Sequence, residues 1–62
     1  MENVRTIMKR RDNLTDAEVD DLFEEFASLL EDNLNPEDAI AEVFGLEPDY
    51  VTDDEVRAAI WT

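Results

Sequence analysis

The chain has 62 residues and a formal net charge of −13, because it carries 18 acidic residues and only five basic ones. A chain of this length forms one small domain, which buries only about 60% of its unfolded surface and is therefore marginally stable. It contains no cysteine and no histidine, which excludes disulfides, thiolate metal sites and histidine-based catalysis. The hydrophobic fraction of 44% is too high for a fully disordered acidic tail.

The charges are divided unevenly along the chain. Residues 1–11 hold four of the five basic residues against one acid, whereas residues 12–62 hold 17 acids against Arg57 alone. The two parts therefore carry net charges of +3 and −16. Such a charge opposes a compact fold by self-repulsion. We expect it to be offset by high salt, by a basic partner, or by a function that uses the negative field.

The first 13 residues are predicted to form either a short basic helix or a flexible arm. Val4, Ile7 and Met8 have helical spacing, which favours an amphipathic helix over residues 3–11, although chain ends are often disordered. The basic residues of this segment are Arg5, Lys9, Arg10 and Arg11. We expect them either to pair with acids of the chain itself or only to increase solubility, and an exposed pair would contribute about 0–1 kcal/mol.

Residues 15–32 are predicted to form the longest helix. Thr15 and Glu18 have the spacing of a capping box, in which each side chain accepts a hydrogen bond from the backbone N–H of the other residue. From Val19 to Leu30, apolar residues recur at intervals of three and four, which gives the helix one broad face toward the core. Asn33 tolerates the left-handed conformation that ends many helices.

A shorter helix is predicted to follow at once, over residues 36–44. Asn35 is a favourable N-cap, and Pro36 suits the first helical position, where its missing N–H costs nothing. Gly45 ends this helix at a position where a positive φ is needed.

A turn and a last helix complete the chain. Pro48 cannot continue a helix, so residues 47–50 are predicted to form a turn. Thr52 and Glu55 then repeat the capping-box spacing, which predicts a helix over residues 53–61. The whole chain is therefore predicted to be a single acidic domain, an all-α bundle of three helices, or of four if the basic segment is helical.

The outward positions of the long helix carry an unusual number of acids. Eight carboxylates occur over about 17 residues, or roughly 26 Å of helix axis, which is about one charge per 3 Å. One DNA strand carries a phosphate about every 3.4 Å. No lysine or arginine interrupts these acids, although like charges four residues apart destabilise a helix by about 0.2–0.5 kcal/mol per pair.

Three interpretations of this helix are open. It could imitate nucleic acid and occupy the basic groove of a DNA- or RNA-handling protein, it could reflect adaptation to a salty cytoplasm, or it could be a solubilising face. Direct binding of nucleic acid is not expected, because phosphate contacts need Lys and Arg. Small chains without disulfides or metals often oligomerise, so a structural homo-oligomer with its acids outside for solubility is the alternative.

We predict a non-enzymatic protein that engages a basic protein surface, such as that of a nucleic-acid-binding protein. The predicted partner-binding acids are Asp20, Asp21, Glu24, Glu25, Glu31 and Asp32 on the long helix, with Glu37, Asp38 and Glu42 as a second patch. Tyr50, Trp61 and Phe44 are the candidate exposed apolar residues. Tyr and Trp are common interface anchors, but in so small a domain they more often cover the core.

No catalytic residue, metal ligand or cofactor is predicted. Catalysis by carboxyls needs a pocket that separates their pKa values, and Ser28 has no histidine to activate it. The segment from Asp49 to Glu55 lacks the glycine and the spacing of a calcium-binding loop. No apolar run approaches the about 20 residues that span a bilayer, and no signal peptide is recognised, so a cytoplasmic location is expected.

The segment from Val43 to Val51, Val-Phe-Gly-Leu-Glu-Pro-Asp-Tyr-Val, resembles a stretch of small, acidic, uncharacterised proteins of bacteria and phages. In those proteins a helix ends at the glycine and a Pro-Asp-Tyr turn follows. The resemblance implies a small helical protein of a phage or mobile element, in the cytoplasm of the host cell. Acidic inhibitors of host defence, including anti-restriction and anti-CRISPR proteins, are common in that setting. The resemblance carries over no binding residue.

Overall fold

A computed structural model describes residues 2–61 of the chain. These residues form four α-helices and one short 3₁₀ helix and no strand. The elements are α1 (Val4–Arg11), α2 (Asp16–Glu31), α3 (Pro36–Phe44), η1 (Pro48–Thr52) and α4 (Asp54–Ile60). The prediction of an all-α fold is confirmed, in its four-helix form. None of the helices in the described part of the chain has the length and hydrophobicity to cross a membrane.

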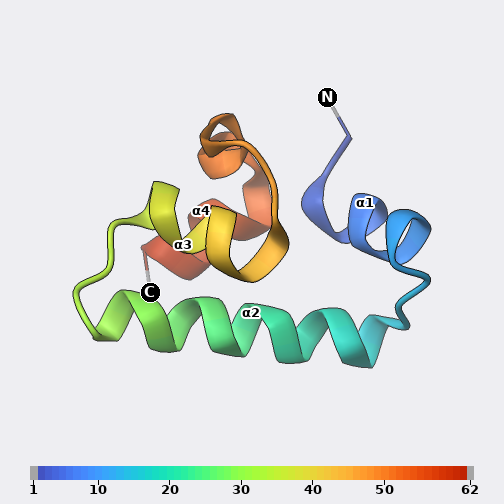
Figure 1. Cartoon of the computed structure of the whole chain (residues 1–62), viewed down its shortest axis with the longest axis horizontal. Helices are drawn as coiled ribbons and strands as arrows, with labels where there is room; N and C mark the ends of the chain where they lie inside the picture. The colour runs from blue at the N-terminus through green and yellow to red at the C-terminus, as the bar shows by residue number, and fades with distance from the viewer. Residues whose placement is uncertain (1, 62) are drawn as a thin grey trace.

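The longest helix, α2, organises the other elements (Figure 1). It runs along one side of the molecule, α1 lies over its N-terminal half, and α3 and α4 lie over its C-terminal half. The 3₁₀ helix η1 joins α3 to α4 on the side away from α2. The molecule measures 29 × 22 × 18 Å, so every helix is close to the surface along most of its length.

The helix ends follow the local capping signals at four of the predicted places. Thr15 and Glu18 make both hydrogen bonds of the capping box at the start of α2. Asn35 accepts a hydrogen bond from the N–H of Glu37 at the start of α3. Asn33 and Gly45 have φ values of 69° and 64°, which is the left-handed conformation that ends α2 and α3.

The core lies between α2 and the three helices that cover it. Its nine buried apolar residues are Val4, Ile7, Met8, Val19, Phe26, Ala39, Ile40, Phe44 and Val56. Phe44 was predicted to be a candidate exposed residue, and that prediction is wrong, since it is 1% exposed. The reason is that the last turn of α3 faces α2, where the rings of Phe23 and Phe26 lie 5.0 Å and 5.6 Å from the Phe44 ring.

The predicted start of the last helix is wrong by one residue. Thr52 is the final residue of η1, and its hydroxyl donates to the carbonyl of Asp49 at 3.1 Å. Asp53 is the N-cap of α4 instead, because its Oδ1 accepts hydrogen bonds from the N–H groups of Glu55 and Val56. The turn predicted over residues 47–50 is a 3₁₀ helix that continues to Thr52, so the extended N-cap conformation occurs at Asp53 and not at Thr52.

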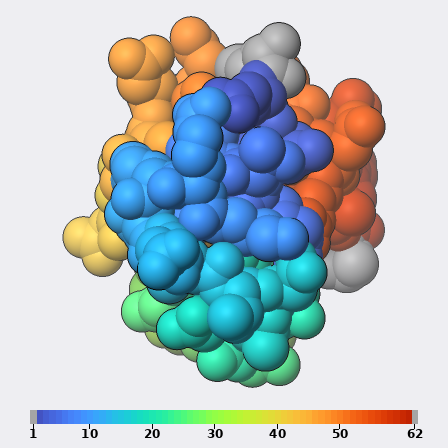
Figure 2. Space-filling model, turned by 90° about the vertical axis from the view of Figure 1, so that its right-hand side faces the viewer, coloured from blue at the N-terminus to red at the C-terminus, as the bar shows by residue number. Residues whose placement is uncertain are grey.

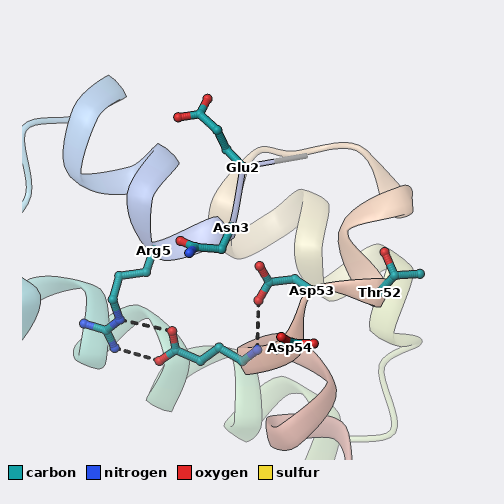
Figure 3. Close-up of a pocket in the computed structure, with 7 residues that line it drawn as sticks. Glu2, Asn3, Arg5, Thr52, Asp53 and Asp54 are labelled. Carbon is teal, nitrogen blue, oxygen red and sulfur yellow. Dashed lines mark hydrogen bonds and ion pairs between the residues drawn. The ribbon is translucent and has the colours of Figure 1, made fainter.

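The same Asp53 carboxylate also binds the start of the first helix, whose N-cap is Asn3. Its Oδ2 accepts a hydrogen bond from the N–H of Val4, at 2.8 Å, across 49 residues of sequence. Asp53 is 7% exposed, and Figure 3 shows it beside the start of α1. One carboxylate therefore satisfies N–H groups at the N-termini of two helices, where the helix dipole also favours negative charge.

We predict that Asp53→Ala lowers the free energy of unfolding by about 2–4 kcal/mol, because losing an N-cap costs about 0.5–2 kcal/mol and an unsatisfied buried donor about 1–3 kcal/mol. Thr52→Ala should change it by less than about 0.5 kcal/mol, as expected for a surface position. Urea unfolding of both variants measures the difference. Equal losses for the two variants would show that Asp53 does not have this double role.

Candidate functional site

Arg5 joins three helices through its guanidinium group. Its Nε and Nη2 donate to the two carboxylate oxygens of Glu55 on α4, at 3.0 Å and 2.7 Å. Its Nη1 and Nη2 also donate to Asp16 and Asp20 on α2. These hydrogen bonds, chiefly those to Glu55 and Asp20, raise the pKa of Arg5. Figure 3 shows the paired hydrogen bonds that Arg5 extends from α1 toward α4.

The other three basic residues of α1 are also paired within the chain. Lys9 forms an ion pair with Asp16 at 3.2 Å, and Arg10 pairs with Glu2 at 2.6 Å. The hydrogen bond from Lys9, together with that from Arg5, lowers the pKa of Asp16. The basic residues of this segment thus pair with the chain's own acids, and they do so from the helix α1.

Arg11 has a further role at the end of another helix. It pairs with Asp12 at 3.0 Å, and its guanidinium also donates to the carbonyl of Phe44 at 2.7 Å. The last turn of α3 contains no basic residue of its own. Arg11 therefore supplies from α1 the positive charge that favours the C-terminus of α3.

These contacts place all four cations of α1 at one end of the molecule. In Figure 2, which views that end, α1 lies between α4 and the start of α2. The acids that take part in these ion pairs are Glu2, Asp12, Asp16, Asp20 and Glu55. Asp20 was predicted to belong to the partner-binding acids, but the structure engages it with Arg5 instead, because α1 packs beside the first turns of α2.

The other eight predicted acids form the candidate site. All eight are exposed, and within residues 2–61 none of them makes an ion pair or a side-chain hydrogen bond. We call them the acidic surface: Asp21, Glu24, Glu25, Glu31 and Asp32 of α2 and its C-cap, with Glu37, Asp38 and Glu42 of α3. The structure thus separates a charge-balanced end at α1 from an unbalanced region over the rest of α2 and over α3.

The acids of α2 lie on the side of the helix that faces solvent. Asp21, Glu25 and Asp32 are four and seven residues apart and so follow one stripe, and the buried Val19 and Phe26 lie on the opposite side. From Asp21 to Asp32 the five carboxylates cover about 16 Å of axis, or roughly one charge per 4 Å. This spacing is close to the about 3.4 Å between phosphates along one DNA strand.

The C-terminus of α2 is electrostatically unfavourable. Glu31 is its last residue and Asp32 its C-cap, and the last turn contains no basic residue. Carbonyl groups at a helix C-terminus carry a partial negative charge, so acids there lower helix stability. Glu37 and Asp38 occupy the first turn of α3, where the opposite end of the dipole favours them. The unfavourable interaction with the helix dipole is therefore concentrated at Glu31 and Asp32.

The two predicted aromatic anchors have different environments. Tyr50 lies in η1 and is half-buried against the core, so it covers the core as the more common interpretation expected. Trp61 is 81% exposed, so the same interpretation is wrong for it. Its backbone is fixed as the C-cap of α4, since its N–H donates to the carbonyl of Arg57 at 3.0 Å. The indole therefore projects into solvent from an ordered position.

One hollow in the described structure lies at a joint between helices. It has a volume of about 360 Å³ and is open to solvent, between the N-termini of α1 and α4. Its lining includes Arg5, Asp53 and Glu55. Arg5 of α1 donates to Glu55 of α4, and Asp53 accepts from the N–H of Val4 in α1. No buried side-chain polar atom among residues 2–61 lacks a hydrogen-bond partner. The sequence did not indicate this joint, because its partners are about fifty residues apart.

Comparison of the chain with protein-family models, with curated protein sequences and with solved structures finds no match. The resemblance to small acidic proteins of bacteria and phages therefore stays a prediction. The assignment of function rests on the geometry and charge of the molecule.

We predict that Arg5→Ala destabilises the fold by about 1–3 kcal/mol, because it removes three partly exposed ion pairs, each contributing about 0.2–1 kcal/mol, and leaves three carboxylates facing one another. Arg10→Ala changes the net charge equally but removes only the pair with Glu2, so its loss should stay below about 0.5 kcal/mol. Thermal unfolding at low and high salt measures both. Equal losses of stability in the two variants would show that the change in net charge, and not the ion pairs of Arg5, causes the effect.

Proposed function

We propose that this protein is a non-enzymatic binding protein that places its acidic surface against a basic surface of another protein. In the specific form of the proposal, it is an inhibitor that imitates nucleic acid and occupies the basic groove of a nucleic-acid-handling protein. The observation that carries the proposal is the separation of charge. The four cations of α1 pair with acids at one end, and the eight exposed carboxylates of the acidic surface form no ion pair with any cation of residues 2–61.

A purely solubilising role explains this separation less well. Solubility requires net charge but no particular arrangement of it, and ordinary solvated helices mix both signs. The chain has four cations that could relieve the repulsion along α2, yet they pair with only two acids of that helix, Asp16 and Asp20. The repulsion is left in place from Asp21 onward. A basic partner would convert that repulsion into attraction and would also raise the association rate.

The geometry of α2 supports a nucleic-acid-like target in particular. Its five unpaired carboxylates follow a rigid helix at roughly one per 4 Å, which is near the charge spacing of a single nucleic-acid strand. A protein groove lined with Lys and Arg binds phosphates largely through the release of counterions, without reading the bases. An ordered row of carboxylates can satisfy the same groups.

The alternative of a structural oligomer loses its original basis. It required an apolar stripe left for other copies, but the stripe of α2 is covered by α1, α3 and α4 of the same chain. The solution mass, measured by sedimentation at low and high salt, tests this alternative directly. A tight homo-oligomer would favour it.

We predict that replacing Asp21, Glu24 and Glu25 with Lys abolishes capture of basic host proteins. The matched control carries Lys at three other exposed acids, Glu47, Asp49 and Asp54, so its net charge changes by the same amount. Both variants and the unchanged protein are immobilised and exposed to bacterial lysate, with and without double-stranded DNA as a competitor.

The expected result is a set of bound proteins that the control retains, the α2 variant loses, and DNA displaces. Circular dichroism confirms that both variants remain helical. Equal loss of capture by the two variants would mean that total charge and not the acidic surface determines binding. If DNA does not displace the captured proteins, the proposed imitation of nucleic acid is wrong, but the more general proposal of a basic partner still stands.

A further inference from the structure

The outward side of α4 and its C-cap carries a row of four exposed residues, which we call the α4 stripe. The four are Asp54, Arg57, Ala58 and Trp61. They lie at intervals of three and four positions and therefore follow one face of the helix. The opposite face packs into the molecule, where Val56 is buried and Ala59 and Ile60 lie against the core. The stripe is thus the part of α4 that points away from the rest of the chain.

The α4 stripe differs in charge from its surroundings. Arg57 is the only basic residue among residues 12–62, and it balances Asp54, so the stripe has no net charge. Neither side chain makes an ion pair or a side-chain hydrogen bond within residues 2–61, although they are one turn apart. Trp61 follows one turn later and is 81% exposed. The stripe therefore combines an unpaired acid, an unpaired cation and an exposed indole.

These charges select a second copy of the chain as the occupant of the stripe. A purely cationic or purely anionic partner would match only one of the two charges. When two copies of α4 meet antiparallel about a two-fold axis between residues 55 and 56, Asp54 of each copy faces Arg57 of the other. Because such an interface is formed twice by the same surface, both ion pairs form together. A parallel arrangement would place like charges opposite each other.

The antiparallel arrangement also covers the indole. Trp61 lies four residues beyond Arg57, or about 6 Å along the helix axis. It therefore extends past the first residue of the other α4 and lies beside the η1 of that copy, where burial of the ring is favourable. One face of a short helix gives a contact at the low end of the interface range, below about 1,200 Å², where complexes are weak and transient. This contact therefore differs from the tight oligomer of the structural alternative.

We propose that two copies of this protein associate weakly through antiparallel α4 stripes, with reciprocal ion pairs between Asp54 and Arg57 and with each Trp61 indole buried against the other copy. The inference does not rest on the proposed function, because the acidic surface lies on α2 and α3 and stays outside the stripe. Repulsion between two chains of net charge −13 opposes the contact at long range. Association should therefore increase from about 0.01 M to 0.15 M salt, as the Debye length falls from about 30 Å to about 8 Å.

Trp61 reports the contact, because it is the only tryptophan of the chain and its indole N–H gives a single nuclear magnetic resonance signal. We predict that this signal shifts as the protein concentration rises to about 1 mM at 0.15 M salt, and that the sedimentation mass rises toward that of a dimer. Trp61→Ala should weaken the association by about tenfold, measured by sedimentation. A constant signal and a monomeric mass over this range would overturn the proposal.

Two charge variants test the pairing itself. Asp54→Lys makes both charges of the stripe positive, and Arg57→Glu makes both negative, so each variant alone should remain monomeric at about 1 mM. An equal mixture should associate as the unchanged protein does, since each charged position of one variant then faces the opposite charge of the other. The two substitutions change the net charge by two units in opposite directions, so the mean net charge of the mixture is that of the unchanged protein. Circular dichroism shows that both variants are folded.

The outcomes separate this pairing from a general effect of charge. If overall repulsion alone controlled association, Asp54→Lys would associate more strongly than the unchanged protein, because it is less negative, and the proposal would be wrong. A mixture of the two folded variants that stays monomeric would also overturn it. Association restored only in the mixture supports the reciprocal ion pairs. None of these results bears on capture of basic proteins by the acidic surface, so this inference and the proposed function can fail independently.

Discussion

Two side chains hold the first and last helices of this small protein together: the Asp53 carboxylate, which binds the starts of α1 and α4 at once, and the Arg5 guanidinium, which pairs with Glu55. The rest of the structure depends on this joint, because α1 supplies three of the nine buried apolar residues. A chain of 62 residues has a stability of only about 3–9 kcal/mol at typical values per residue. It cannot lose a third of its core and remain folded.

The joint also determines where the charges lie. Since α1 must pack beside the first turns of α2, its cations reach Asp16 and Asp20 and no acid further along that helix. Arg11 donates a hydrogen bond to the carbonyl of Phe44 at the end of α3 and also pairs with Asp12. The four cations of α1 are therefore committed to contacts that hold the helices together. The packing of α1 thus explains where the cations lie, but it does not account for the number of acids from Asp21 onward.

Local signals in the sequence predicted the helices well, and contacts between distant residues could not be predicted from it. The capping box at Thr15 and the left-handed Gly45 depend on residues within a few positions, so the sequence determined α2 and α3 nearly to the residue. The joint of Asp53 with Val4 spans 49 residues, and no local pattern marks it. Thr52 was mistaken for the N-cap of α4 because two adjacent residues both suit that role, and only the length of η1 decides between them. The exposure of Trp61 could not be predicted for a related reason, because burial depends on which distant residues pack against a side chain.

Two unfavourable features meet at the far end of α2 from this joint. Glu31 and Asp32 place negative charge at the negative end of the helix dipole, without a cation in the last turn. Trp61, the C-cap of α4, leaves 81% of its surface in water. Neither feature contributes to the fold, since none of these three side chains makes a side-chain hydrogen bond or ion pair within residues 2–61. Natural sequences usually break such local rules at functional positions.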